Sequence, residues 1–254
     1  MKRVTKAAVA PSLLRRFSAA RPDADWDQFR QSDGRYRETA AQIRLDQRGI
    51  CAYCEIDLLK ADAPNKLPDF RIEHFHPKAP HAPPPNWATD WTNLLGSCHG
   101  GSQRDVADPN RFTPPDFSCD VPKADNDWTA DIFNPLTDVP AFPRFFKYVE
   151  SDGAIAVDTD LCPEPVVGKA TETIKRLNLN ASRLTRMRQA VIAGLRDQIA
   201  MLLEAGATVE DASKQLSSAM FPSDADGEWP AFFTCIRWYL GSSAEDRLVE
   251  VGYS

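Results

Sequence analysis

Apolar residues recur at helical spacing in the last third of the chain. Steps of three and four residues connect Ile174, Leu177, Leu184, Met187, Val191, Leu195, Ile199 and Leu202. This pattern predicts two helices from about residue 168 onward, broken near residues 179–180 and stopped near Gly206. A shorter helix over residues 209–220 and a buried helix over residues 232–240 are expected to follow.

The first half of the chain predicts helices followed by short strands and loops. Residues 11–30 are expected to be helical in pieces, and a helix from Asp33 or Gly34 to Arg48 is expected to stop at Gly49. Residues 50–53 and 70–75 have strand character, whereas prolines mark residues 76–90 as a stiff loop. The prediction is an α+β fold with an N-terminal helical segment 1–49, a small core 50–137, a linker with short strands 138–167 and a C-terminal helical domain 168–254.

Composition narrows the class of protein. The chain has 254 residues, of which 43% are hydrophobic, so it can bury a sizeable core and wholesale disorder is excluded. It contains no apolar run long enough to cross a membrane, and its N-terminal apolar stretch is too short for a signal peptide. A cytoplasmic protein with no membrane partner is therefore expected.

Charge is segregated along the chain. The formal net charge is −6, but residues 1–50 carry +5, residues 51–168 carry −10, residues 169–196 carry +6 and residues 197–254 carry −7. Such blocks are often just solvated faces, but here two basic segments also flank an acidic centre suited to a cation. The basic side chains after residue 168 are candidates for phosphate contact or for docking onto an acidic partner: Lys175, Arg176, Arg183, Arg186, Arg188 and Arg196.

The cysteines suggest a metal site. Cys51 and Cys54 form a CxxC between a predicted helix end and a strand, which favours a zinc knuckle over a redox pair. Two further ligands must come from elsewhere; Cys98 and Cys119 are the best candidates, with His99 as an alternative to Cys119. The competing interpretation is four unrelated buried thiols. Cys162 and Cys235 are expected to belong to the core.

All four histidines, His74, His76, His81 and His99, lie within 26 residues. Glu73 and His74 stand together at the end of a predicted strand that Pro77 terminates. A carboxylate and an imidazole presented together suit metal binding and general-base catalysis, although a lone histidine is more often structural. His76 is expected to lie near the same site, His81 to be solvated and His99 to support the zinc.

In this context Asn93, followed by two leucines and Cys98, makes the sequence resemble the HNH endonucleases of ββα-metal type. More narrowly, it resembles PtuB, the HNH subunit of the Septu and retron-associated anti-phage systems. The resemblance covers most of the chain and rests on several motifs: Ile72-Glu73-His74-Phe75 with Pro77-Lys78, Asn93-Leu94-Leu95-Gly96 with Cys98, Cys119-Asp120 with Lys123, Asn134-Pro135-Leu136, and Leu177-Asn178-Leu179-Asn180 with Arg188.

The resemblance implies a role for each matching residue. His74 would be the general base and Asn93 would orient it or pin its loop, while Glu73 and Asp120 would hold one catalytic Mg²⁺ or Mn²⁺. Zinc on the four cysteines would be structural, within a ββα core whose helix opens at the second cysteine pair. Weaker candidates for contact with nucleic acid or a partner are His76, Lys78, Lys123, Arg183, Arg186 and Arg188.

Two features depart from the family pattern. Twenty residues separate Cys98 from Cys119, which matches the narrower group only, and the third motif position carries Asp120 where His or Asn is usual. The resemblance implies an anti-phage nuclease that works with an ABC-type ATPase, PtuA, on DNA more than on RNA. The alternatives are a catalytically inactive, zinc-stabilised adaptor that binds a partner protein, and a CxxC redox protein.

Overall fold

The computed structural model describes residues 1–61, 63, 65–79, 85–223 and 227–254. The predicted interruptions of the first helical segment are confirmed. The first helix, α1, spans Ser12–Ala20, α2 spans Trp26–Arg30 and α3 spans Asp33–Asp46. Asp25 caps α2, since its side chain accepts a hydrogen bond from the Gln28 backbone N–H and the Gln28 side chain reciprocates. After α3 the chain turns at Gly49, whose φ of +79° favours glycine.

The remaining helices follow the predicted pattern closely. They are α4 (Glu164–Arg176), α5 (Ser182–Glu204), α6 (Val209–Met220), α7 (Phe233–Leu240) and α8 (Ser242–Glu250). The sequence did not predict α8, because the polar run at its start gives a weak apolar stripe. No helix among the described residues is both long and apolar enough to cross a bilayer.

Two small antiparallel sheets complete the fold. The first pairs β1 (Arg71–His74) with β2 (Leu94–Ser97), opposing Arg71 to Ser97 and His74 to Leu94. The second pairs β3 (Phe146–Tyr148) with β4 (Ile155–Val157). Single 3₁₀ turns lie at Trp91–Asn93 and Pro109–Arg111.

The expected strand at residues 50–53 is wrong. Only Ile50 makes a bridge, to Asp57, and Cys51 starts a tight turn instead. The helix implied after the second cysteine pair is also not formed, because residues 119–125 make successive turns with positive φ at Cys119 and Ala124. The structure therefore has a mixed α+β fold with the β1–β2 hairpin, but the described residues do not complete a ββα unit there.

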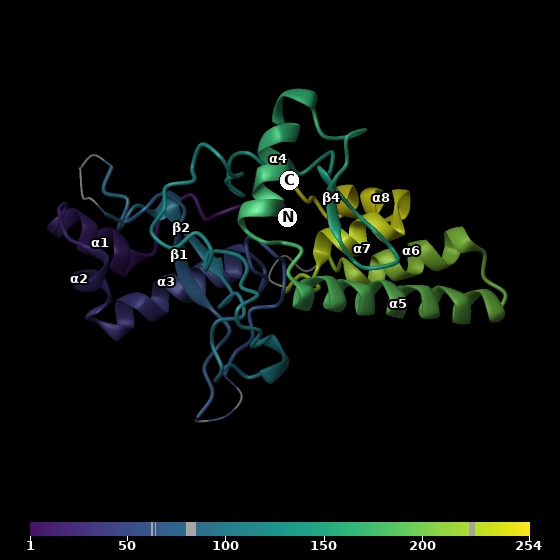
Figure 1. Cartoon of the computed structure of the whole chain (residues 1–254), viewed down its shortest axis with the longest axis horizontal. Coiled ribbons are helices and arrows are strands. Elements are labelled where there is room, and N and C mark those ends of the chain that lie inside the picture. Colours follow the sequence, from purple (N-terminus) through teal and green to yellow (C-terminus); the bar gives the residue numbers. More distant parts are fainter. Residues whose placement is uncertain (62, 64, 80–84, 224–226) are drawn as a thin grey trace.

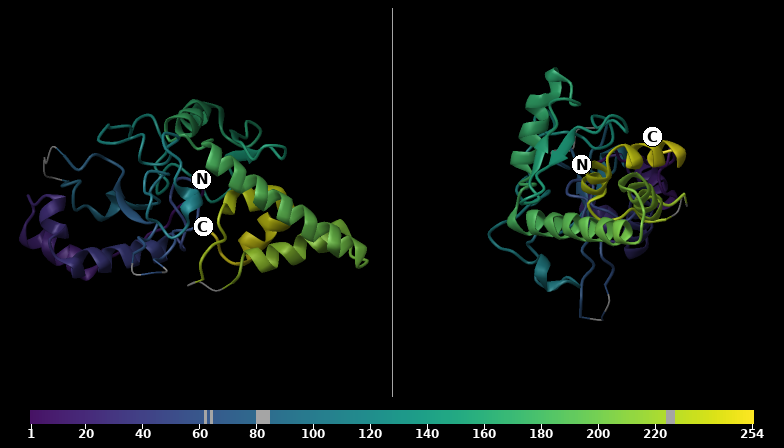
Figure 2. Two further views of the ribbon diagram at one scale, coloured as in Figure 1. Left: turned by 60° about the horizontal axis from the view of Figure 1, so that its bottom comes forward. Right: turned by 90° about the vertical axis from the view of Figure 1, so that its right-hand side faces the viewer.

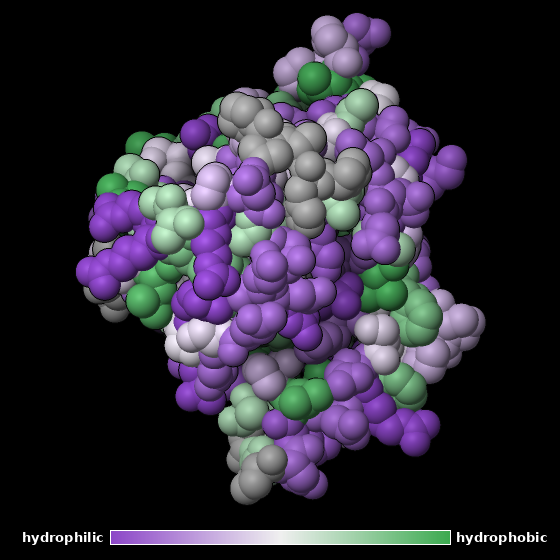
Figure 3. Space-filling view, turned by 90° about the vertical axis from the view of Figure 1, so that its left-hand side faces the viewer, coloured by the Kyte–Doolittle hydropathy of each residue, from purple (hydrophilic) through white to green (hydrophobic). Residues whose placement is uncertain are grey.

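Most of the helices form two groups at opposite ends of the molecule, and both chain termini lie between them. Helices α1–α3 lie at one end of the molecule and α5–α8 at the other, with the N- and C-termini near the middle (Figures 1 and 2). The end that carries α1–α3 is largely hydrophilic, with scattered apolar side chains (Figure 3).

Three apolar clusters hold these elements together. The largest surrounds the cysteines and takes residues from all four predicted segments, for example Val4, Tyr53, Phe146 and Leu184. A second joins α5, α6, α7 and α8, and a third packs α1–α3 against the β1–β2 hairpin through Phe29, Ile43 and Leu94. The hairpin is thus fixed on both flanks by helical segments.

Candidate metal centre and nuclease site

Four buried cysteines meet beside the hairpin. The sulfur atoms of Cys51, Cys54, Cys98 and Cys119 lie within 4.8 Å of one another. Neighbouring sulfurs are 3.6 Å apart for Cys98–Cys119, 3.7 Å for Cys54–Cys98 and 3.9 Å for Cys51–Cys119. Four thiolates at about 2.3 Å from one zinc ion stand about 3.8 Å apart at tetrahedral corners, so the geometry fits structural zinc.

Hydrogen-bond donors surround the cysteine sulfurs. The Cys98 backbone N–H donates to Cys51 Sγ at 3.5 Å, and the buried Arg183 guanidinium donates to Cys98 Sγ at 3.8 Å and to Ser118 Oγ at 2.7 Å. Hydrogen bonding with Cys119 lowers the pKa of the Cys98 thiol to about 7. Burial raises the pKa of the Cys54 and Cys119 thiols, and the thiolate is the form that binds metal, so zinc binding would release their protons.

The remaining candidates for this site lie elsewhere. The described metal-ligand group contains the four cysteines and not His99, so Cys119 and not His99 completes the set. The His99 backbone N–H donates to Asp69 at 2.7 Å. Cys162 and Cys235 are buried in the main apolar cluster, in agreement with the expectation that they belong to the core.

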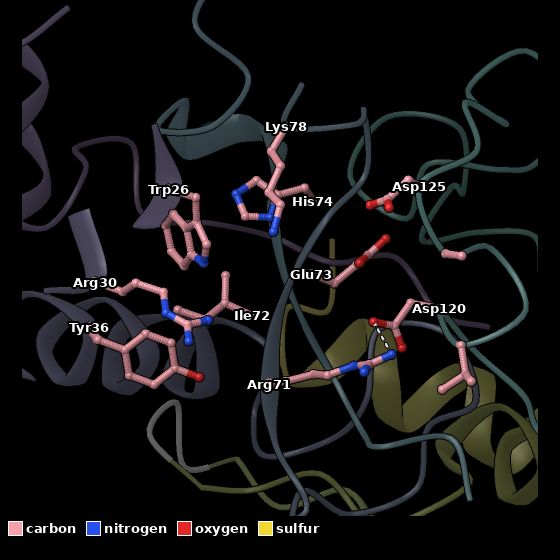
Figure 4. A pocket seen from close by; sticks show the side chains of 12 residues that line it. Trp26, Arg30, Tyr36, Arg71, Ile72, Glu73, His74, Lys78, Asp120 and Asp125 are labelled. Atoms are coloured by element: carbon pink, nitrogen blue, oxygen red, sulfur yellow. Dashed lines mark ion pairs between the residues drawn. The ribbon is translucent and has the colours of Figure 1, made fainter. Parts of the chain in front are cut away.

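A cavity of about 370 Å³ opens beside β1 (Figure 4). Glu73 and His74 extend to opposite sides of the strand, as adjacent strand residues do, yet both line this cavity. Asp120, Lys78 and Ile72 also line it, together with residues that the sequence did not single out: Trp26, Arg30, Tyr36, Arg71, Val121, Ala124 and Asp125.

Two carboxylates on one side of the cavity are each paired with a cation. Glu73 Oε1 lies 2.8 Å from Lys123 Nζ, and Asp120 Oδ2 lies 2.6 Å from a guanidinium nitrogen of Arg71. Burial, together with the charge of Asp120, raises the pKa of Glu73 to about 8. The protein alone therefore favours the protonated form of Glu73 at pH 7, so a divalent ion held there would have to displace that proton.

His74 is held as a neutral base. Its Nε2 lies 3.0 Å from the Ala88 carbonyl, which can only accept, so Nε2 carries the proton and Nδ1 is left unprotonated. The ring packs against the Trp26 edge, with centroids 4.6 Å apart at 83°. Burial, aided by Lys78 and Lys123, lowers the pKa of His74 to about 4, so the imidazole is neutral at pH 7.

Asn93 fixes the backbone that follows His74. Its Oδ1 accepts from the His76 N–H at 2.7 Å, while Nδ2 donates to the carbonyls of His76 at 3.0 Å and Trp87 at 2.7 Å. Asn93 is fully engaged by main-chain groups and does not contact the His74 ring. Of its two expected roles, the geometry matches pinning the loop.

Several expected contact residues are buried instead of facing solvent. Lys123 donates to the His74 carbonyl at 2.7 Å in addition to pairing with Glu73. Arg183 supports the cysteines, and Arg188 donates to the Leu179 carbonyl at 2.6 Å and is 1% exposed. Their cationic groups are already committed to the protein interior, so these three expected surface contacts are corrected to internal ones.

The other described residues that were expected to contact nucleic acid or a partner are not committed to internal ion pairs. Arg186 is exposed on α5, and Lys78 lines the cavity. His76 stacks on Trp87 at 4.0 Å and is not part of the cavity wall. His81 lies outside the described residues.

Besides the cysteines, the described residues contain no group of three or more potential metal ligands. Glu73 and Asp120 are two carboxylates that line one cavity. That donor set suits a hard ion such as Mg²⁺, which keeps several of its waters and takes one or two carboxylates.

The fold and site together define a cysteine-stabilised hairpin that presents a neutral histidine beside two carboxylates. A search of family models gave no match, and no solved structure matched. The chain is 34% identical over 213 residues to a curated Escherichia coli protein named as an HNH endonuclease of retron Ec83; the match covers 76% of this chain and 79% of the relative. The chain belongs to the HNH endonuclease family and is a nuclease.

Proposed function

We propose that this protein hydrolyses phosphodiester bonds with His74 as general base and one divalent ion, Mg²⁺ or Mn²⁺, held by Glu73 and Asp120. The observation that carries the proposal is that His74, whose Nε2 lies 3.0 Å from the Ala88 carbonyl, and the two carboxylates Glu73 and Asp120 line one cavity. When bound, the ion would supply positive charge to the phosphate and to the departing oxygen.

The protein's own groups would perform the proton transfer. His74 Nδ1 accepts a proton from water, and the water oxygen forms a bond to phosphorus as the bond to the 3′-oxygen breaks. The Ala88 carbonyl, which accepts from Nε2, then stabilises the imidazolium. The 3′-oxygen takes a proton from solvent. Lys78, on the same cavity, is placed to contact a phosphate oxygen.

We propose further that the nuclease acts in an anti-phage defence system together with an ABC-type ATPase of the PtuA kind, on DNA more than on RNA. The name of the relative, which assigns it to a retron, supports this context. The overall charge of −6 supports a need for a partner, because an acidic chain attracts phosphate weakly.

Plasmid and single-strand cleavage assays test the proposal. The chain is assayed with Mg²⁺, with Mn²⁺ and with EDTA, alone and with the candidate ATPase. Cleavage that requires the ion and disappears in His74→Ala is expected, whereas full cleavage by that variant would contradict the mechanism.

One observation favours the alternative of an inactive adaptor. Both carboxylates already have protein cations as partners, Lys123 and Arg71, so a divalent ion must compete with them. Tight binding of a partner protein with no cleavage in any metal would support the adaptor.

A further inference from the structure

The cysteine cluster and the carboxylate pair are connected through two buried hydroxyl groups. Tyr53 stands between Cys51 and Cys54, is fully buried, and its hydroxyl donates to Glu73 Oε1 at 3.4 Å. Ser97 immediately precedes Cys98, is also fully buried, and its hydroxyl donates to Asp120 Oδ1 at 3.0 Å. Each carboxylate therefore takes a hydrogen bond from a residue next to a cysteine ligand.

The backbone adds a third connection. Asp120 directly follows Cys119, whose φ of +62° places the turn that carries both residues. Ser97 Oγ is also 3.9 Å from Cys51 Sγ, so one hydroxyl lies between a cysteine sulfur and the Asp120 carboxylate. A change in the spacing of the four sulfurs must then shift Ser97, Tyr53 or Asp120, because no flexible segment separates them.

We propose that Tyr53 and Ser97 are positioning residues through which the zinc cluster sets the affinity of Glu73 and Asp120 for the divalent ion. The inference rests on the proposed function, in which these carboxylates hold that ion. Hydrogen bonds from outside the ligand shell fix the direction of ligand oxygens, and their removal costs about 10–100-fold in metal affinity. The structural metal thereby becomes a condition for the catalytic one.

The test uses Tyr53→Phe and Ser97→Ala in the full chain, each of which removes one hydroxyl and no ring or backbone. Tyr148→Phe and Ser217→Ala are matched controls, since both parent residues are buried and lie outside the cavity. Zinc content is measured by metal analysis, Mn²⁺ affinity by titration calorimetry on the zinc-loaded protein, and cleavage as kcat and KM across Mn²⁺ concentrations.

The expected result is full zinc content in both variants with a Kd for Mn²⁺ raised about tenfold or more. The kcat at limiting Mn²⁺ falls and recovers at saturating Mn²⁺, while KM for nucleic acid stays unchanged. Recovery by added ion distinguishes positioning from a loss of folding. The controls keep the wild-type Kd.

Unchanged Mn²⁺ affinity in both zinc-loaded variants would overturn the inference and leave the nuclease proposal standing. A wild-type chain that binds no Mn²⁺ would overturn both. If Ser97→Ala loses zinc, Tyr53→Phe decides the question, because its hydroxyl contacts only the carboxylate side.

Discussion

Arg71 and Ser97 lie opposite each other on β1 and β2, and each contacts a different oxygen of Asp120. This cross-strand pair orients a carboxylate that comes from a loop more than twenty residues away in sequence. The hairpin register therefore determines where Asp120 points. A shift of one strand by one residue would turn its partner of Asp120 to the other face of the sheet and separate Arg71 from Ser97.

Replacing His74 with alanine is expected to abolish most cleavage while zinc content is preserved. Loss of a general base costs about 10²–10⁴-fold in rate, and the cysteines do not contact the ring. Cleavage rate and metal analysis on the same preparation provide the measurement. His76→Ala is the matched control, because that ring stacks on Trp87 outside the cavity, and it should retain most of the activity.

Replacing Cys51 with serine is expected to release zinc and destabilise the fold. Loss of a structural metal belongs to the small group of changes that cost about 4 kcal/mol or more. Urea unfolding and metal analysis would detect both effects. Cys235→Ser, in a helix away from the cluster, should keep its zinc; a stable Cys51→Ser protein with unchanged unfolding would show that the cluster is not structural.

Lys123→Met is expected to make stability depend on divalent ions. The change removes the cation 2.8 Å from buried Glu73, and losing one partner of such a pair costs about 3–5 kcal/mol. Mn²⁺ should restore part of this loss by providing a new positive charge, giving a larger rise in Tm than in the wild type. Lys169→Met, which breaks the half-buried pair with Asp138, is the control and should show only the wild-type Mn²⁺ response.

Acidification is expected to destabilise the protein through His74. Its pKa is lowered from 6.5 to about 4 on folding, so between these values the unfolded chain binds more protons than the folded one. The contribution of His74 to the free energy of unfolding therefore rises with pH across this window, by at most about 1.4 kcal/mol per pH unit. In the acid direction, this contribution decreases from pH 6.5 to about 4 and is constant below that.

Comparing urea unfolding of the wild type and His74→Ala between pH 4.5 and 7 isolates this contribution. The variant should show a smaller pH dependence. Equal slopes would mean that His74 does not titrate with a lowered pKa in the folded protein.

The sequence predicted the helices of the C-terminal half and the CxxC pair because both depend on short-range patterns, whereas Cys98 and Cys119 were only candidates, with His99 as an alternative to Cys119. Helical spacing predicts α6 at residues 209–220, where the structure has it. The sulfurs of the CxxC pair lie close to those of Cys98 and Cys119. The strand β2 was missed, since Leu94–Ser97 is buried throughout and lacks the alternation of a half-exposed strand.

Other features depend on contacts that no local pattern carries. Trp26 and Tyr36 form a wall of the cavity only because α2 and α3 pack against the hairpin. Lys123 and Arg188 have the residue type of surface contacts, but the Glu73 carboxylate and the Gly153 carbonyl that accept from them come from distant segments. The sequence therefore shows that a side chain is basic, but it does not show which group that side chain contacts.

The side chain of Asn93 joins the main chain at residue 76 to the main chain at residue 87. The second of these positions directly precedes Ala88, whose carbonyl accepts from His74 Nε2. One amide side chain therefore sets the separation between the strand end that carries His74 and the carbonyl that fixes the orientation of its ring.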